Sequence, residues 1–281
     1  MIDIKDIGQL SFHCNINTYE YKRKTIILYD DHRWILNVLF EACVLNLFHN
    51  IVPNVIYFDY HDDGFPTHIT LNKLGVDNVK DIDARAFLSM VEFDVRHFDD
   101  NWITTGMELG LINNVVCIGQ EANDNIDLWE NNEYLDKRGV CHKGYCIRHL
   151  QEELKQGGVF DRNLRVTDDI ISSIRNIFDY SEHGFWAEVK SPFILDFDLD
   201  CFTSNETGEQ RAWSEEQFKE CYFSNPEVYD FMCSLIDRVQ VITICREPKC
   251  CGGLGESNKI LGYLDRYFFD GALGTDPIQQ L

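Results

Sequence analysis

Short apolar runs alternate with amphipathic stretches along this chain. Four runs are apolar on both sides of an extended segment, as in strands of a buried parallel sheet. They are Thr25–Leu28, Val55–Phe58, Val115–Ile118 and Val239–Cys245. A fifth run, Phe193–Asp200, starts apolar and becomes acidic. Residues at helical spacing occupy other segments, namely Trp34–Ala42, Ile82–Val91, Ile147–Lys155, Asp168–Ile177, Val228–Ile236 and Ile260–Phe269.

This alternation of strands and helices predicts an α/β fold of three layers, with a doubly wound, mostly parallel sheet. The 281 residues are 44% hydrophobic and 13% aromatic, enough to build one large core. We find no linker, low-complexity stretch or internal repeat. The sequence therefore predicts a single domain over residues 1–281.

Acidic residues gather where two of the predicted strands end. Asp59, His61 and Asp63 follow the run Val55–Phe58, and Phe193–Asp200 carries Asp196, Asp198 and Asp200. Residues two apart share a side of an extended segment, so each set is expected to form one row. Such a row can be the solvated face of an amphipathic strand. Both runs begin apolar on each side, however, and crowded carboxylates at a sheet edge favour a bound cation.

A third strand end adds a histidine. Thr25–Leu28 breaks into Tyr29-Asp30-Asp31-His32, and the helical pattern follows. Asp30 or Asp31 can cap that helix. If the strands are parallel, His32 lies at the edge where the acidic runs end.

These residues resemble a known family. Asp31-His32, Asp59-x-His61-x-Asp63, Asp198-x-Asp200 and Glu247-Pro248 follow the order of the ureohydrolase pattern of arginase and agmatinase. Residues 31–36, 59–63, 242–248 and 250–253 look more closely like the peptide arginases, a branch of the arginase/deacetylase superfamily. The resemblance implies an arginase/deacetylase-like fold. It also implies hydrolysis of arginine side chains within a peptide, leaving ornithine and urea.

The resemblance further implies six metal ligands, namely His32, Asp59, His61, Asp63, Asp198 and Asp200. Four carboxylates match the charge of two divalent cations, and the neutral imidazoles add none. Oxygen-rich coordination with some imidazole favours Mn²⁺, although iron or cobalt also fits. Asp196 matches no ligand position, and we interpret it as a carboxylate that supports the ligands or the fold.

Catalytic roles follow from this set. A hydroxide bridging two metals would attack the guanidinium carbon, with Asp63 as both ligand and proton acceptor. Glu247 would bind the guanidinium through paired hydrogen bonds; the alternative for Glu247 is a surface salt bridge with Arg246 or Lys249. Arginases use a histidine as proton shuttle, and the candidates here are His97 and His68.

Other functions remain open at this point. The enzyme could act on free arginine or another amidine, and a metal-stabilised protein that binds a peptide without turnover is a third possibility. A zinc deacetylase of the same superfamily is disfavoured, because those enzymes use a His-His pair and the sequence has none. The stretch from Phe98 to Trp102 either lines a substrate entrance or caps a helix running toward Gly110.

Net charge and cysteine content limit the partners and the cellular location that we expect. The net charge of -22 disfavours nucleic acid and anionic membranes as partners. The start of the chain lacks a signal-peptide pattern and no run suits a membrane span, so we expect a cytoplasmic enzyme. The eleven cysteines then read as reduced thiols. A zinc site at Cys141, His142, Cys146 and His149 is a weaker alternative, and the oligomeric state has no signal.

Overall fold

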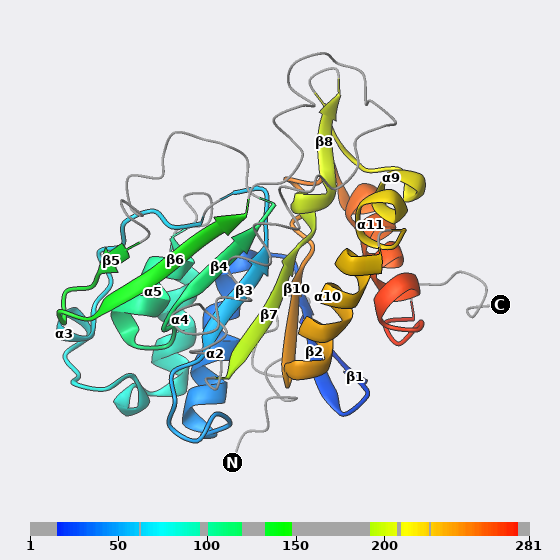
Figure 1. Cartoon of the computed structure of the whole chain (residues 1–281). Helices are drawn as coiled ribbons and strands as arrows, with labels where there is room; N and C mark the ends of the chain where they lie inside the picture. The colour runs from blue at the N-terminus through cyan, green and yellow to red at the C-terminus, as the bar shows by residue number, and fades with distance from the viewer. Residues whose placement is uncertain are drawn as a thin grey trace.

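The computed structural model describes residues 16–61, 63–95, 101–119, 133–147, 192–206, 209–224 and 226–274. An eight-stranded sheet forms their centre (Figure 1). Its strands are β1 (Asn17–Tyr21), β2 (Lys24–Tyr29), β3 (Asn54–Phe58), β4 (Val115–Ile118), β5 (Glu133–Leu135), β6 (Cys141–Ile147), β7 (Phe193–Asp198) and β10 (Val241–Cys245). A separate hairpin of β8 (Thr203–Glu206) and β9 (Glu209–Ala212) follows β7 in the chain.

The order of the strands is β1-β2-β10-β7-β3-β4-β6-β5. Every pairing from β2 to β6 is parallel, and β1 and β5 pair antiparallel at the two edges. The chain passes from β2 to β3 while β10 and β7 lie between them in space. In open α/β sheets ligands bind beyond the carboxyl ends of the strands at such a switch in order.

Helices cover both faces of the sheet (Figure 1). The helical segments are η2 (His32–Trp34), α2 (Ile35–Val44), α3 (Leu71–Leu74), η3 (Val79–Asp81), α4 (Ala84–Phe93), α5 (Trp102–Leu109), η5 (Leu199–Phe202), α9 (Glu215–Tyr222), α10 (Pro226–Arg238) and α11 (Leu254–Phe268). Together with the parallel pairings, they confirm the predicted doubly wound, mostly parallel α/β sheet. In the described part of the chain, no helix has both the length and the apolar character to cross a bilayer.

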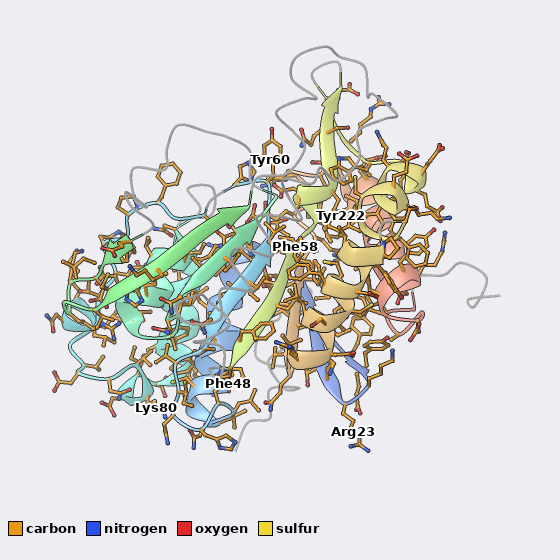
Figure 2. The ribbon with its side chains drawn as sticks, viewed as in Figure 1. Arg23, Phe48, Phe58, Tyr60, Lys80 and Tyr222 are labelled. Carbon is orange, nitrogen blue, oxygen red and sulfur yellow. The ribbon has the colours of Figure 1, made fainter. Side chains whose placement is uncertain are left out.

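Two hydrophobic cores fill the spaces between sheet and helices, and β3 contributes to both. Val55 and Tyr57 pack in the core that holds α2, α4 and α5. Ile56 and Phe58 point the other way, into the core with α9, α10 and α11. Phe58 is fully buried and contacts Tyr222 edge to face, with ring centroids 6.1 Å apart (Figure 2). A strand buried on both sides accounts for its continuous apolar sequence.

The structure corrects the expected shape of the two acidic stretches. β3 ends at Phe58, and β7 ends at Asp198. Residues 59–61 and Asp63 therefore follow β3 as a loop, and Asp200 lies in η5, so strand alternation does not place their side chains. Alternation does hold for Asp196 and Asp198, which lie two apart in β7 and both face His32. The predicted helix at Ile147–Lys155 is also wrong at its start, because Ile147 ends β6. The rest of it, and the predicted helix Asp168–Ile177, lie outside the described residues.

Truncating Phe58 tests the core beneath the carboxyl ends of the strands. We expect Phe58→Ala to lower the free energy of unfolding by about 3–5 kcal/mol, because a fully buried ring leaves a cavity. Phe93→Ala is the matched control: that side chain is 81% exposed and should change stability by no more than about 0.5 kcal/mol. Urea unfolding of both variants gives the comparison, and equal midpoints would contradict the assignment of the core.

Candidate metal centre

Four neighbouring strands deliver acidic and histidine side chains to one edge of the sheet. His32 follows β2, Asp59 follows β3, Asp196 and Asp198 lie at the end of β7, and Glu247 follows β10. These strands are adjacent in the order β2-β10-β7-β3 and run parallel. Residues distant in the sequence therefore meet at the carboxyl edge.

His32 lies at the centre of this cluster and is 3% exposed. Its Nδ1 atom lies 2.8 Å from Asp63 Oδ2, 3.0 Å from Asp198 Oδ2 and 3.4 Å from Asp59 Oδ2. None of these contacts has the geometry of a hydrogen bond, so Nδ1 is a buried nitrogen without a hydrogen-bond partner. Three carboxylates facing one ring nitrogen form the environment of a cation ligand.

The opposite ring nitrogen fixes the orientation of this imidazole. His32 Nε2 lies 2.7 Å from Asp196 Oδ2. Asp196 Oδ1 accepts hydrogen bonds from Tyr29 Oη at 3.2 Å and from Thr243 Oγ1 at 2.5 Å. A carboxylate that accepts the Nε2 proton leaves the Nδ1 lone pair available for a metal. Asp196 thus has the supporting place that the sequence suggested for it.

Three aspartates divide their oxygens between the backbone and the cluster. Asp59 Oδ1 accepts from the amide of His61 at 2.7 Å, and Asp198 Oδ1 accepts from the amide of Asp200 at 3.1 Å. Asp200 Oδ1 accepts from the amide of Tyr60 at 3.2 Å, which joins the loop after β3 to the turn after β7. The bonds of Asp59 and Asp198 are short Asx-type turns, whereas that of Asp200 joins distant loops, and the second oxygen of each aspartate remains for the cluster.

A second group adjoins the first. His61, whose side chain is 41% exposed, places Nδ1 3.0 Å from Asp200 Oδ2 and 3.8 Å from Asp59 Oδ1. Ligand atoms of His61, Asp59 and Asp200 lie within 4.8 Å of one another, as do those of His32, Asp59 and Asp63. Asp59 belongs to both groups. Five of the six residues proposed as ligands therefore form two linked sets of donors, and the sixth, Asp198, joins them through its contact with His32.

Burial makes this collection of charges costly. Burial, followed by repulsion from Asp63, Asp198 and Asp200, raises the pKa of Asp59 well above its ordinary value. Burial and the neighbouring acids raise the pKa of Asp198 in the same way. The pKa of Asp63 is lowered, since its contacts with His32 and Trp102 outweigh burial. The surrounding carboxylates likewise raise the pKa of His32 against the effect of burial.

The residues present fit divalent cations. Asp59 Oδ2, Asp200 Oδ2 and His32 Nδ1 are buried atoms without hydrogen-bond partners, and all three belong to the cluster. Unpartnered buried acceptors of this kind are unfavourable unless a cation or a donor satisfies them. His32, Asp59, Asp63 and Asp198 would surround one cation. His61, Asp59 and Asp200 would surround a second, and the carboxylate oxygens suit hard or borderline metals.

Glu247 stands beside the cluster in a constrained turn. Its φ angle is +33°, a left-handed conformation that is unfavourable for a residue other than glycine. Its carbonyl accepts hydrogen bonds from the amides of Cys250 and Cys251. Its carboxylate lies within 4.8 Å of ligand atoms of His32 and Asp198. Burial, then the charge of Asp200, raises the pKa of Glu247 to about 7.

The sequence left open a surface salt bridge between Glu247 and Arg246, but Arg246 pairs with a different carboxylate. Arg246 Nε donates to Asp30 Oδ1 at 2.5 Å, and its amide donates to Tyr29 O. This ion pair joins the ends of β10 and β2. It leaves the Glu247 carboxylate facing the cluster.

Other candidates have different outcomes. His97 and His149 lie outside the described residues. His68 is exposed in the segment between β3 and α3 and belongs to none of the described donor groups. Cys141 is exposed, whereas His142 is buried and bonded to Asn113 O and Asp136, which gives it a structural role. Of the two residues expected to cap the helix after β2, Asp31 caps η2, and its side chain accepts a hydrogen bond from the amide of Arg33.

Sequence reasoning missed the support that Trp102 gives to the site. The helix toward Gly110 exists as α5, but Trp102 is 1% exposed and does not line an entrance. Its indole Nε1 donates to Asp63 Oδ2, and its ring lies 4.7 Å from the His32 ring between centroids. The signal available was a tryptophan at the start of a helix, which needs a polar partner when buried.

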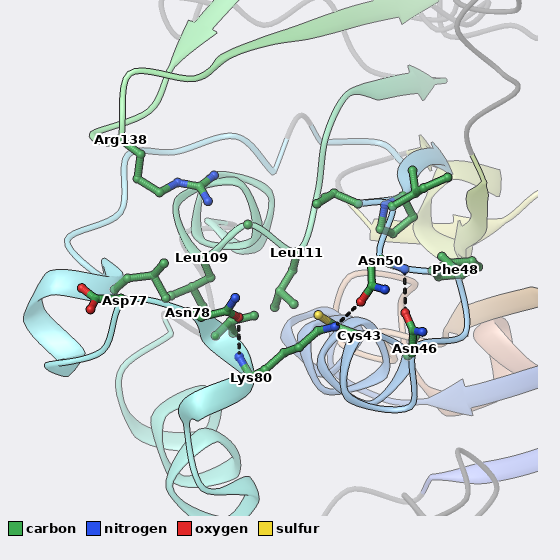
Figure 3. Close-up of a pocket in the computed structure, with 17 residues that line it drawn as sticks. Cys43, Asn46, Phe48, Asn50, Asp77, Asn78, Lys80, Leu109, Leu111 and Arg138 are labelled. Atoms are coloured by element: carbon green, nitrogen blue, oxygen red, sulfur yellow. Dashed lines mark hydrogen bonds between the residues drawn. The ribbon is translucent and has the colours of Figure 1, made fainter.

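A cavity of about 290 Å³ lies elsewhere in the molecule (Figure 3). It is lined by the end of α2, by residues 50–53 just before β3, and by Lys80 and Arg138. Its walls include residues that precede β3, whereas the metal candidates follow the ends of the strands. The cavity is therefore not part of the cluster.

Comparison with known proteins gives a limited result. No family model matches the chain, and no curated protein matches it. Among solved structures, it is similar to a proclavaminate amidino hydrolase from Streptomyces clavuligerus, with 12% identity, a TM-score of 0.44, and coverage of 89% of this chain and 64% of that one. A formimidoylglutamase from Bacillus subtilis has 11% identity, a TM-score of 0.44 and coverage of 89% and 61%. For a Helicobacter pylori arginase the identity is 12% and the TM-score is 0.40, with coverage of 86% of this chain and 71% of that one.

The chain thus spans 64% and 61% of the length of the first two structures. At identities and TM-scores this low, nothing about the function of this chain follows from the likeness. Its chemistry has to be judged from its own side chains.

Removing Asp196 tests its support of His32. We expect Asp196→Ala to weaken Mn²⁺ binding by about 10–100-fold, because His32 loses the partner that orients its ring. Chelator competition gives the affinity. Asp237→Ala, which removes an exposed carboxylate on α10, should leave it unchanged. An unaltered affinity in Asp196→Ala would contradict this role.

The metal-free protein is expected to lose stability as the pH rises. Glu247 titrates at an ordinary value of 4.5 when unfolded and at about 7 when folded, so the folded state binds its proton more tightly. The stability that Glu247 contributes is fully present below pH 4.5 and is lost as the pH rises to about 7. The raised pKa values of Asp59 and Asp198 act in the same direction.

Urea midpoints at about pH 5 and about pH 7.5 measure this effect. The lowered pKa of Asp63 does not oppose it, because the stability from Asp63 is lost only as the pH falls below 3.8. Saturating Mn²⁺ should remove most of the difference by neutralising the cluster. A midpoint that rises with pH in the metal-free protein would contradict the electrostatic account.

Proposed function

We propose that this protein is a binuclear metallohydrolase that cleaves the guanidinium group of arginine residues in a peptide, giving ornithine and urea. The observation that carries the proposal is the convergence of two linked donor groups, which share Asp59, beside the carboxylate of Glu247. Two divalent cations, most favourably Mn²⁺, would supply hydroxide near neutral pH by lowering the pKa of a water molecule.

Side chains of the protein would bind the substrate and transfer the protons. Glu247 lies next to both donor groups, and a carboxylate there can accept two hydrogen bonds from the planar guanidinium. This contact would hold the guanidinium carbon in one orientation. The left-handed backbone at Glu247 and the two amides bonded to its carbonyl restrict its movement.

Asp63 is the proposed proton acceptor. Its Oδ2 contacts His32 Nδ1 and accepts from the Trp102 indole, so the carboxylate is kept ionised inside a buried site. An ionised carboxylate can take the proton released when the nucleophile attacks. The departing amine must then gain a proton, for which we propose His97 as shuttle, with His68 as the alternative.

A peptide substrate is supported by the likeness of residues 31–36, 59–63, 242–248 and 250–253 to peptide arginases. The high negative charge would attract a cationic arginine residue. Free arginine or another amidine is the alternative substrate, and a binding protein without turnover is the alternative function. Nine of the cysteines in the described part of the chain are free thiols, which supports the proposal of a cytoplasmic setting.

A urea assay tests the reaction. The Mn²⁺-loaded protein should release urea from an arginine-containing peptide faster than from free arginine. The peptide should lose about 42 Da for each converted residue. Urea from free arginine alone would favour the arginase alternative. Metal binding without urea from any arginine compound would contradict hydrolysis and favour the binding protein.

Glu247→Gln separates substrate binding from metal binding. We expect loss of about 10²-fold or more in kcat/KM, because the amide no longer matches the cationic guanidinium. Metal content should remain that of the wild type, since His32, Asp59 and Asp63 are untouched. Glu216→Gln, an exposed carboxylate in α9, is the control. Full activity in Glu247→Gln would exclude the proposed role.

A further inference from the structure

Cys250 adds a soft donor to the edge of the proposed metal centre. Ligand atoms of Asp200, Glu247 and Cys250 lie within 4.8 Å of one another. The Cys250 thiol and the Glu247 carboxylate share a side-chain hydrogen bond. The proton between sulfur and oxygen therefore occupies a position that a cation could take. The role proposed for Glu247 does not use this thiol.

The turn after β10 holds these two side chains together. The amide of Cys250 donates to Glu247 O at 2.9 Å, and the amide of Gly253 donates to Pro248 O at 2.6 Å. Gly252 has a φ of +84°, and a Cβ there would lie 1.9 Å from Gln210 O on β9. The turn thus packs against the hairpin without room for a side chain, which limits how far Glu247 and Cys250 can separate.

Asp200, the third member of this group, brings a buried carboxylate oxygen that has no hydrogen-bond partner. It is 1% exposed, its Oδ1 accepts from the amide of Tyr60, and its Oδ2 is buried without a hydrogen-bond partner, 3.0 Å from His61 Nδ1. Oδ1 is occupied by the Tyr60 amide, but one carboxylate oxygen can bridge two cations, as carboxylates do in two-metal sites. Asp200 can therefore serve the binuclear centre and still face a further cation.

We propose that Asp200, Glu247 and Cys250 form an additional site for a thiophilic divalent cation such as Zn²⁺ or Cd²⁺. The cation displaces the thiol proton to solvent and binds Sγ as thiolate, together with a carboxylate oxygen of Glu247. The Cys250 thiolate and the Glu247 carboxylate carry two negative charges, which match one divalent cation, while the charge of Asp200 is already balanced by the cations of the main centre. Sulfur distinguishes this site from the oxygen and imidazole donors of the main centre and favours zinc over manganese.

Occupancy of this site would inhibit the enzyme, a consequence that rests on the proposed function. The cation takes the Glu247 oxygens that otherwise bind the guanidinium. Zinc inhibition is therefore competitive with the arginine-containing peptide. The site makes the protein sensitive to excess zinc while its manganese stays in place.

Cadmium absorption tests the site without any activity measurement. Cd²⁺ added to the Mn²⁺-loaded full chain should produce a thiolate-to-metal charge-transfer band that saturates at about one Cd²⁺ per chain. Cys250→Ser should abolish the band or weaken Cd²⁺ binding by at least about tenfold. Glu247→Gln, which keeps the thiol, should also weaken it. Cys43→Ser, a partly buried thiol in α2 beside the separate cavity, should behave as wild type.

Metal analysis and inhibition complete the test. Manganese content should not fall as Cd²⁺ or Zn²⁺ binds, and Zn²⁺ should raise the KM for the peptide in wild type and not in Cys250→Ser. A band that survives in Cys250→Ser, or cadmium that replaces manganese, would overturn the site. If the Cys250-dependent band appears and no variant releases urea, the cation site stands and the proposed hydrolysis fails.

Discussion

Repulsion among buried carboxylates is the constraint on which this site depends. Five buried aspartates, each at most 2% exposed, crowd together: Asp59, Asp63, Asp196 and Asp198 surround His32, and Asp200 faces His61. Water cannot screen these charges, so the cluster is stable only with protons or cations bound to it. The raised pKa values of Asp59 and Asp198 mean that these carboxyl groups bind protons more tightly. The atoms of His32, Asp59 and Asp200 without hydrogen-bond partners are the ones that can bind cations instead.

The sheet topology makes this crowding possible. Inserting β10 and β7 between β2 and β3 brings four parallel strand ends together. The two hydrophobic cores then hold the strands from both faces, and residues such as Phe58 and Leu195 lie directly beneath the charged edge. The free energy of packing in these cores therefore maintains side chains in positions that their charges alone would not favour.

Local strain marks the two residues proposed to act on substrate. Asp63 and Glu247 both have left-handed backbones, with φ angles of +47° and +33°. Aspartate adopts this conformation more readily than glutamate does, and each residue is held by neighbours. Trp102 and His32 bind Asp63, and the turn from Pro248 to Gly253 holds Glu247. Strain kept in place by many contacts is common where a side chain must point in one direction.

The sequence by itself determined the kinds of element and the chemistry available. Apolar runs such as Val55–Phe58 and Val115–Ile118 became buried parallel strands, because side chains buried on both faces must be apolar. The residue types in Asp59-x-His61-x-Asp63 and Asp198-x-Asp200 were sufficient to suggest a cation. Strand alternation was right for Asp196 and Asp198 inside β7 and wrong for the residues beyond the strand ends, where Asx-type turns at Asp59 and Asp198 shape the backbone.

Only the tertiary structure decided which side chains contact one another in the site. Strand order, which depends on packing between distant segments, placed Asp196 on His32 and Trp102 on Asp63. It likewise joined Arg246 to Asp30 and brought Asp200 to Glu247 and Cys250. These contacts span from 39 to more than 200 positions in the sequence. Periodicity reports which way a side chain faces within its own element, and it carries no information about which distant element lies opposite.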